Sequence, residues 1–182
     1  MQWAIMNGEE EVGITLMYMD EGMDTGDIID IEKIKITLED DIGTVHDKMS
    51  VLGADILKKN YDNIINDNIK RIKQDDNEAT LAPMITREME AIDFNDNGKN
   101  IINKIRAFSP WPLTRILINE EEIKVVKAHF EEKNNTIPSE IIIKNNELGI
   151  ECLDGIIYLD IIKPVGKKEM NIKSYLNGLK NK

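Results

Sequence analysis

A short acidic loop holds the residue types in this sequence that could do chemistry. Between residues 17 and 27 lie two glycines and four carboxylates, which are Asp20, Glu21, Asp24 and Asp27. A carboxylate can accept a proton from an attacking group or help to hold a cation, and loops between strands often carry such groups. The alternative is a solvated acidic turn without a chemical role, and composition alone favours that alternative.

Metal binding does not suit this loop. An EF-hand loop needs acids at alternate positions, a glycine at the sixth position and a glutamate at the twelfth. Counted from Asp20, the third position is Gly22 and the sixth is Thr25. Cys152 is the only cysteine, which excludes an internal disulfide and a cysteine-rich zinc site and predicts a buried, reduced thiol. We therefore expect no metal here.

Two apolar runs flank the loop and are expected to position it. Residues 12–20 and 27–36 carry apolar side chains at alternate positions, which predicts two strands joined by the acidic loop. This arrangement would present the carboxylates at one end of a sheet.

A long helix is expected after the second strand. Thr44 suits the N-cap position, Asp47 completes a capping-box pattern, and apolar residues then recur at helical spacing to about Asn66. Gly53 lies inside this helix, where a close approach to a strand would account for it. Two strands and one helix bury little apolar surface, so residues 1–66 should carry an uncovered apolar face.

The second half of the chain has the pattern of a small β domain. Residues 67–96 are polar and turn-rich and are expected to form an extended connector. Asn97 is expected to cap a short helix that ends before Pro110, and a last helix should begin near Asn171. Five strand-like runs lie between these helices, over residues 115–118, 123–128, 139–143, 148–152 and 156–162. Short strands at this spacing predict a small antiparallel barrel.

The charge is distributed unevenly along the chain. Residues 1–80 hold 8 Lys and Arg against 19 Asp and Glu, whereas residues 81–182 hold 15 of each kind. The last stretch, 161–182, holds six Lys against one Glu, which suits contact with a phosphate backbone, although a solvated helix end accounts for it equally well. No apolar run approaches the ~20 residues needed to span a bilayer, and no signal-peptide pattern is present. We expect a cytoplasmic protein without a membrane partner.

The segment from Met19 to Asp27 resembles the loop Met-Asp-x-Gly-x-Asp-Thr-Gly-Asp of the folate-dependent formyltransferases, and most closely that of the methionyl-tRNA formyltransferases. Further segments resemble the same family in the same order, namely Gly43–Met49, Gln74 with Ala82–Thr86 and Ile92–Phe94, Ile105–Pro112 and Pro164–Met170. The resemblance covers essentially the whole chain. One departure is Leu113-Thr114, where family members usually have Gly-Ala.

This resemblance implies a fold in three parts. Residues 1–66 would be an α/β remnant, two strands and a long helix from the C-terminal part of a Rossmann-like formyltransferase catalytic domain. Residues 67–96 would be a linker. Residues 97–182 would form a small OB-like β-barrel that binds tRNA.

The resemblance also implies a reaction, in which a formyl group passes from 10-formyltetrahydrofolate to the amino group of methionyl initiator tRNA. Asp24 matches the family's Asp that assists proton movement. The residues expected beside the pterin ring of the folate are Met19, Asp20, Glu21, Gly22 and Met23. The residues expected to contact tRNA are Arg106, Lys127, Lys167 and Lys168. No metal is implied.

The family's Asn-x-His pair and Ser-Leu-Leu-Pro segment do not occur in this sequence, whose only histidines are His46 and His129. The chain therefore resembles a fragment, expected to be inactive alone, and a separately encoded N-terminal half is a candidate partner. Two alternatives stay open: a sugar-nucleotide formyltransferase fragment and a non-catalytic RNA-binding module. The Ala82–Thr86 connector and the Gly166-Lys167-Lys168 ending favour the tRNA enzyme.

Overall fold

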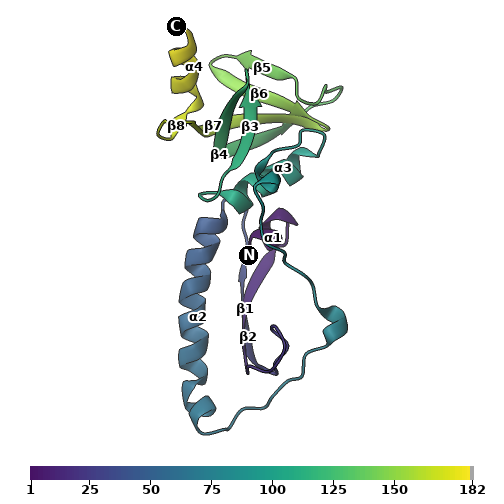
Figure 1. Cartoon of the computed structure of the whole chain (residues 1–182), viewed down its shortest axis with the longest axis vertical. Helices are drawn as coiled ribbons and strands as arrows, with labels where there is room; N and C mark the ends of the chain where they lie inside the picture. Colours follow the sequence, from purple (N-terminus) through teal and green to yellow (C-terminus); the bar gives the residue numbers. More distant parts are fainter. Residues whose placement is uncertain (181–182) are drawn as a thin grey trace. The chain divides into compact units, whose positions relative to one another are not determined.

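The computed structural model describes residues 1–180, which fold into two compact units (Figure 1). The first, here called the hairpin–helix unit, comprises residues 9–40 and 44–84. The second, the sheet unit, comprises residues 1–8, 41–43 and, of the described residues, 85–180. The expected connector over 67–96 is thus divided between the two units.

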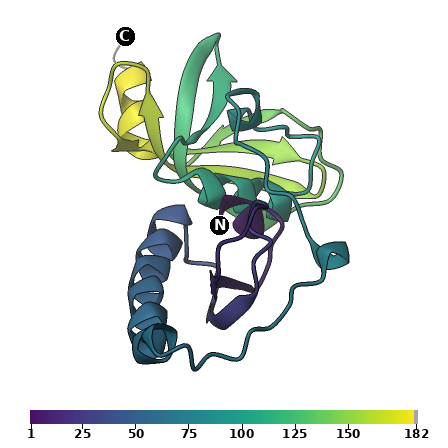
Figure 2. The same cartoon turned by 60° about the horizontal axis from the view of Figure 1, so that its bottom comes forward.

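The hairpin–helix unit is built on the two expected strands. Strands β1 (Glu11–Met17) and β2 (Ile28–Lys35) pair antiparallel, with Ile14 opposite Glu32. Helix α2 (Ile42–Ile65), almost all of which belongs to this unit, lies beside the hairpin in both views (Figures 1 and 2). The short 3-10 helix η1 (Asp76–Glu78) lies in the segment that follows.

Helix α2 packs closely on β1 at a glycine, as the sequence predicts. A Cβ atom added at Gly53 would lie 3.2 Å from Cδ1 of Ile14. Polar contacts extend this packing, because Asn60 Nδ2 donates to Asp30 Oδ2 at 2.8 Å and Lys59 Nζ donates to Glu32 Oε1 at 2.6 Å. The bond from Asn60, together with the Lys59 ammonium, which also lies 3.0 Å from Asp30 Oδ2, lowers the pKa of Asp30.

The expected N-cap role of Thr44 is wrong, because α2 already begins at Ile42. The Thr44 hydroxyl instead donates to Asp40 Oδ1 at 3.0 Å, and the Lys48 ammonium donates to the same oxygen at 2.5 Å. The amide and hydroxyl of Thr37 donate to the other oxygen. Burial alone would raise the pKa of Asp40, but these donors outweigh it and lower the pKa well below its ordinary value. Asp40 therefore anchors the start of α2, and Asp47 stays exposed.

The uncovered apolar face expected of the first unit is present on α2. Four of its apolar side chains are exposed, namely Val51, Leu57, Tyr61 and Ile65. The apolar residues of α2 that are buried are Val45, Met49 and Ile56.

The sheet unit contains all five expected strands. They are β3 (Thr114–Ile118), β4 (Glu121–Glu132), β5 (Ile141–Lys144), β6 (Glu147–Cys152) and β7 (Gly155–Pro164). They form an antiparallel sheet in the order β3-β4-β7-β6-β5, and a short strand that was not predicted, β8 (Met170–Asn171), pairs with β7. Helix α4 (Ile172–Lys180) begins one residue after the predicted position.

Helix α3 (Gly98–Phe108) packs against β3, β4 and β7 and contributes to one apolar core (Figure 2). The short helix α1 (Gln2–Met6), which was not predicted, packs on α3. The 3-10 helix η2 (Glu88–Glu90) precedes α3 along the chain. The free thiol of Cys152 is buried in this core, as expected.

Asn97 occupies the N-cap position of α3, but the expected cap by its side chain is wrong. The Gly98 amide instead donates to Asp154 Oδ1 at 2.7 Å, from the hairpin turn between β6 and β7. A carboxylate at this end of a helix satisfies a free amide and complements the helix dipole. The group that caps α3 thus comes from a segment that is distant from the helix in the sequence.

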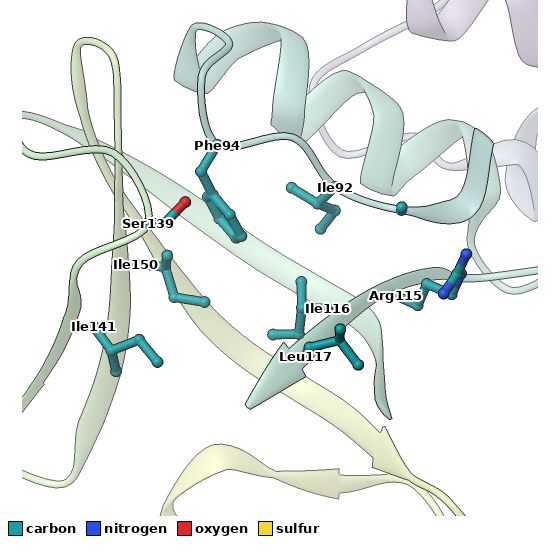
Figure 3. A pocket seen from close by; sticks show the side chains of 9 residues that line it. Ile92, Phe94, Arg115, Ile116, Leu117, Ser139, Ile141 and Ile150 are labelled. Carbon is teal, nitrogen blue, oxygen red and sulfur yellow. The ribbon is translucent and has the colours of Figure 1, made fainter. Parts of the chain in front are cut away.

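The sheet of this unit is open within the described residues. Its edge strands β3 and β5 do not pair with each other, and an apolar hollow of ≈ 260 Å³ lies between them (Figure 3). The hollow is lined by Ala91, Ile92, Phe94, Arg115, Ile116, Leu117, Ser139, Ile141 and Ile150. The sequence predicted a small antiparallel barrel, and no pairing that would close the sheet is found among residues 1–180.

Candidate functional site

The acidic loop lies between β1 and β2, where the sequence places it. The Tyr18 amide donates to the carbonyl of Asp27 at 2.9 Å and closes the base of the loop. Gly26 is buried against this base, and a Cβ there would lie 1.7 Å from the Tyr18 carbonyl oxygen. No side chain larger than hydrogen fits at that position. The loop backbone is therefore fixed at its base.

Two aspartates of the loop have different surroundings. Asp20 Oδ1 accepts from the hydroxyl of Thr25 at 2.6 Å and from the amide of Gly22 at 3.0 Å, so this carboxylate ties the loop to itself. Asp24 is exposed and has a φ of 60°. No hydrogen bond or ion pair within residues 1–180 engages its carboxylate. Asp24 is thus available to a ligand, whereas Asp20 is occupied within the loop.

Gln74 holds the loop from outside, a role that the sequence did not reveal. Its Nε2 donates to the carbonyl of Asp24 at 2.9 Å and to that of Gly26 at 2.6 Å. Next to it, the backbones of Ile28 and Ile72 bond to each other at 2.7 and 3.0 Å. The sequence singled out Gln74 only because it matches a position of the family pattern. No local spacing links it to a loop some fifty residues earlier.

Two methionines of the loop present apolar surface to solvent. Met19, which precedes Asp20, is 94% exposed, and Met23, which lies between Asp20 and Thr25, is 86% exposed. Exposed, flexible thioether side chains can adapt to a flat apolar ligand. The loop therefore combines a fixed backbone, adaptable apolar groups and carboxylates that no described residue engages, that of Asp24 among them.

The four lysines and arginines expected to contact tRNA all lie in the sheet unit. Arg106, on α3, is half-buried and donates to Asn103 Oδ1 at 3.0 Å. Lys127 is exposed on β4 opposite Ile161 of β7. Lys167 and Lys168 are exposed in the turn that follows β7. Three of the four side chains are therefore exposed, on β4 or in the turn after β7, whereas the guanidinium of Arg106 already bonds Asn103.

Neither a metal site nor a membrane span is found in the described part of the chain. No group of three His, Cys, Asp or Glu side chains among residues 1–180 is arranged to hold a metal ion. None of the helices in that range is both long enough and apolar enough to cross a bilayer.

Comparison with known families matches both parts of the chain. A family described as "Formyl transferase, C-terminal domain" matches residues 84–180, and one described as "Formyl transferase" matches residues 1–60. A similar curated protein is the methionyl-tRNA formyltransferase of Staphylococcus epidermidis, 44% identical over 97% of this chain. The match covers 57% of that relative, so the chain spans little more than half of its length.

Solved structures share the fold at lower identity. HypX from Aquifex aeolicus in complex with tetrahydrofolic acid superimposes with a TM-score of 0.71 and 19% identity, over 96% of this chain and 31% of that one. An N-formyltransferase from Helicobacter canadensis, in complex with folinic acid and dTDP-3-aminofucose, gives a TM-score of 0.66 and 24% identity. That match covers 92% of this chain and 59% of the other.

Proposed function

The chain belongs to the formyl transferase family, and from that premise we propose that it takes part in formylating methionyl initiator tRNA for translation initiation, with 10-formyltetrahydrofolate as the donor. The observation that carries this substrate is the 44% identity with a methionyl-tRNA formyltransferase over 97% of the chain. The likeness to the N-formyltransferase from Helicobacter canadensis, at 24% sequence identity, supports a shared fold and no particular substrate. Charged initiator tRNA is cytoplasmic, and the proposal places the chain there.

Asp24 is the residue that we assign to proton movement. When the amine of methionyl-tRNA attacks the formyl carbon, the amine must lose a proton and the carbonyl oxygen must be stabilised as an oxyanion. The exposed, unengaged carboxylate of Asp24 supports the first role, since that of Asp20 is held by Thr25. The match of Asp24 to the family motif supports the same assignment.

The folate is proposed to lie against the loop from Met19 to Met23. The exposure of Met19 and Met23 and the fixed backbone between them support this placement. No metal takes part in the proposed reaction.

The sheet unit is proposed to bind the tRNA as an OB-like domain. The five-stranded antiparallel order and the exposed Lys127, Lys167 and Lys168 support this role, with Arg106 the weaker candidate because it already bonds Asn103. Contacts to phosphates would make tRNA affinity fall steeply with salt.

The oxyanion donors are proposed to come from outside these 182 residues. Neither His46 nor His129 has an asparagine two positions earlier, as the family's Asn-x-His pair requires. The 182-residue polypeptide is therefore expected to be inactive alone, and an N-terminal part that carries this pair would complete it, a separately encoded half being one candidate.

A chimera tests this proposal. The part of the Staphylococcus epidermidis enzyme that precedes its match to this chain is joined to these 182 residues, and formylation of methionyl initiator tRNA and of a dTDP-amino sugar is measured. We expect activity on the tRNA only, lost on Asp24→Asn, and none from the 182 residues alone. Activity on the sugar would replace the proposed substrate, and turnover by the 182 residues alone would refute the need for outside donors.

A further inference from the structure

Trp111 carries the most exposed Trp, Tyr or Phe side chain of the described residues, at 76%. Tryptophan is usually largely buried, and an exposed indole is typical of a surface that binds a partner. None of the roles proposed above uses this residue.

The indole is carried on a fixed loop. Pro110 and Pro112 flank it, and the amide of Leu113, which is buried, donates to the carbonyl of Phe108 at 2.8 Å. The Lys124 ammonium donates to the carbonyl of Pro112 at 2.9 Å. A side chain on so constrained a backbone loses little entropy when it binds.

A row of cations crosses the sheet beside this loop. Lys124 of β4 lies directly opposite Arg115 of β3 on one side and Lys163 of β7 on the other. Residues directly opposite one another share a face of the sheet, and like charges in that position repel. Arg115 has an acidic partner, Glu122 Oε2 at 3.3 Å, whereas within residues 1–180 no carboxylate pairs with Lys124 or Lys163. A bound polyanion would remove this repulsion.

We propose that Trp111 stacks on an unpaired base of the bound RNA, while Lys124 and Lys163 contact the neighbouring phosphates. This inference rests on the proposed function, in which RNA is the partner. A base can stack on an aromatic ring whose face is exposed and lies near cations that bind the adjacent phosphates. The bond from Lys124 to the carbonyl of Pro112 holds the Lys124 ammonium beside the residue that follows Trp111. A protein partner suits this surface less well, because lysines are depleted in protein interfaces.

The test uses the whole chain and a labelled single-stranded RNA of about 12 nucleotides, within the range that one such domain covers. The same strand annealed to its complement provides a probe without unpaired bases. Trp111→Ala should weaken binding to the single strand roughly 5- to 100-fold and leave duplex binding unchanged. Trp111→Phe should restore most of the loss, because phenylalanine keeps a stacking face.

Salt dependence separates stacking from charge. Trp111→Ala should not change the slope of log affinity against log salt, whereas Lys163→Gln should reduce it by about 0.7 on the single strand. Lys144→Gln, a change at an exposed lysine of the opposite edge strand β5, is the matched control and should have no effect. Circular dichroism checks that each variant is folded.

Three outcomes would overturn the inference. Unchanged single-strand binding by Trp111→Ala, with steep salt dependence retained, would refute stacking and leave the proposed function intact. Equal losses on single strand and duplex would show that the indole has no preference for unpaired bases. No binding to either probe by the native chain would refute both this inference and the proposed RNA-binding role of the sheet unit.

Discussion

The side-chain amide of Gln74 donates a hydrogen bond to the carbonyl oxygen of Asp24 at 2.9 Å. The same amide nitrogen reaches the Gly26 carbonyl at 2.6 Å, so one residue of the following segment fixes the backbone on both sides of Thr25. A carboxylate proposed to handle a proton must be held in position, and at Asp24 the protein holds the backbone while no described residue engages the acid group.

Gln74→Ala is expected to loosen the acidic loop without unfolding the chain. Two hydrogen bonds are lost, each contributing about 0.5–1.5 kcal/mol. Hydrogen exchange should therefore quicken in peptides that cover residues 17–28 and stay unchanged in β6. Asn68→Ala changes an exposed amide side chain of the same segment and should leave exchange in the loop at its native rate. Equal exchange in both variants would show that Gln74 does not hold the loop.

Asp24→Asn is expected to separate chemistry from stability. Asparagine tolerates the positive φ of 60° at this position, and no bond to the carboxylate is lost, so the unfolding free energy should change by less than about 0.5 kcal/mol. In the chimera described above, formylation should slow about 10²- to 10⁴-fold, the usual contribution of a group that moves a proton. A variant that is stable and fully active would remove Asp24 from the reaction.

The ion pair between Lys48 and Asp40 predicts a pH dependence of stability. The pKa of Asp40 is lowered in the folded chain, because its donors outweigh the effect of burial. Its contribution is therefore complete above the unfolded pKa near ~4 and is lost as the pH falls below it. Asp40→Asn should cost about 1–3 kcal/mol near pH 7, and the difference from the native chain should shrink as the pH falls.

Urea unfolding followed by circular dichroism across this acid range measures the Asp40 effect. Asp47→Asn is the control, because the side chain of Asp47 is 87% exposed and its ion pair with His46 contributes little. A constant difference between Asp40→Asn and the native chain at every pH would contradict the argument.

Thr114→Val is expected to stabilise the sheet unit by about 1 kcal/mol. Thr114 is fully buried at the start of β3, and its hydroxyl has no hydrogen-bond partner among the described residues. Replacing that hydroxyl by a methyl group removes a buried polar atom at nearly constant volume. Thr136→Val makes the same change where the hydroxyl donates to the Leu153 carbonyl at 3.0 Å, and it should destabilise. Thermal unfolding midpoints that shift in the same direction would refute this reasoning.

Local patterns identified most elements of the fold. Alternating apolar residues predicted both strands of the hairpin and all five main strands of the sheet unit, because one side of each strand had to be apolar. The same patterns could not predict α1 or β8, which are short and have little local signal. The predicted start of α2 was misplaced because Thr44 and Asp47 form a capping pattern in the sequence. In the folded chain Thr44 and Lys48 instead donate hydrogen bonds to Asp40.

The candidate site was only partly visible in the sequence. The four carboxylates of the loop were evident, but the engagement of Asp20 within the loop could not be known, since it depends on Thr25 folding back onto Asp20. The row of Arg115, Lys124 and Lys163 was invisible for a related reason, because strand register brings these residues together.

The sequence by itself determined the strands, the long helix, the acidic loop and the family resemblance, since each depends on residue type and short-range spacing. Only the tertiary structure decided that Gln74 fixes the loop, that Asp154 caps α3 and that, within residues 1–180, β3 and β5 do not pair with each other. Each of these features joins segments distant in the chain. Their partners are selected by packing and by the need of buried polar groups for hydrogen bonds, which local patterns do not encode.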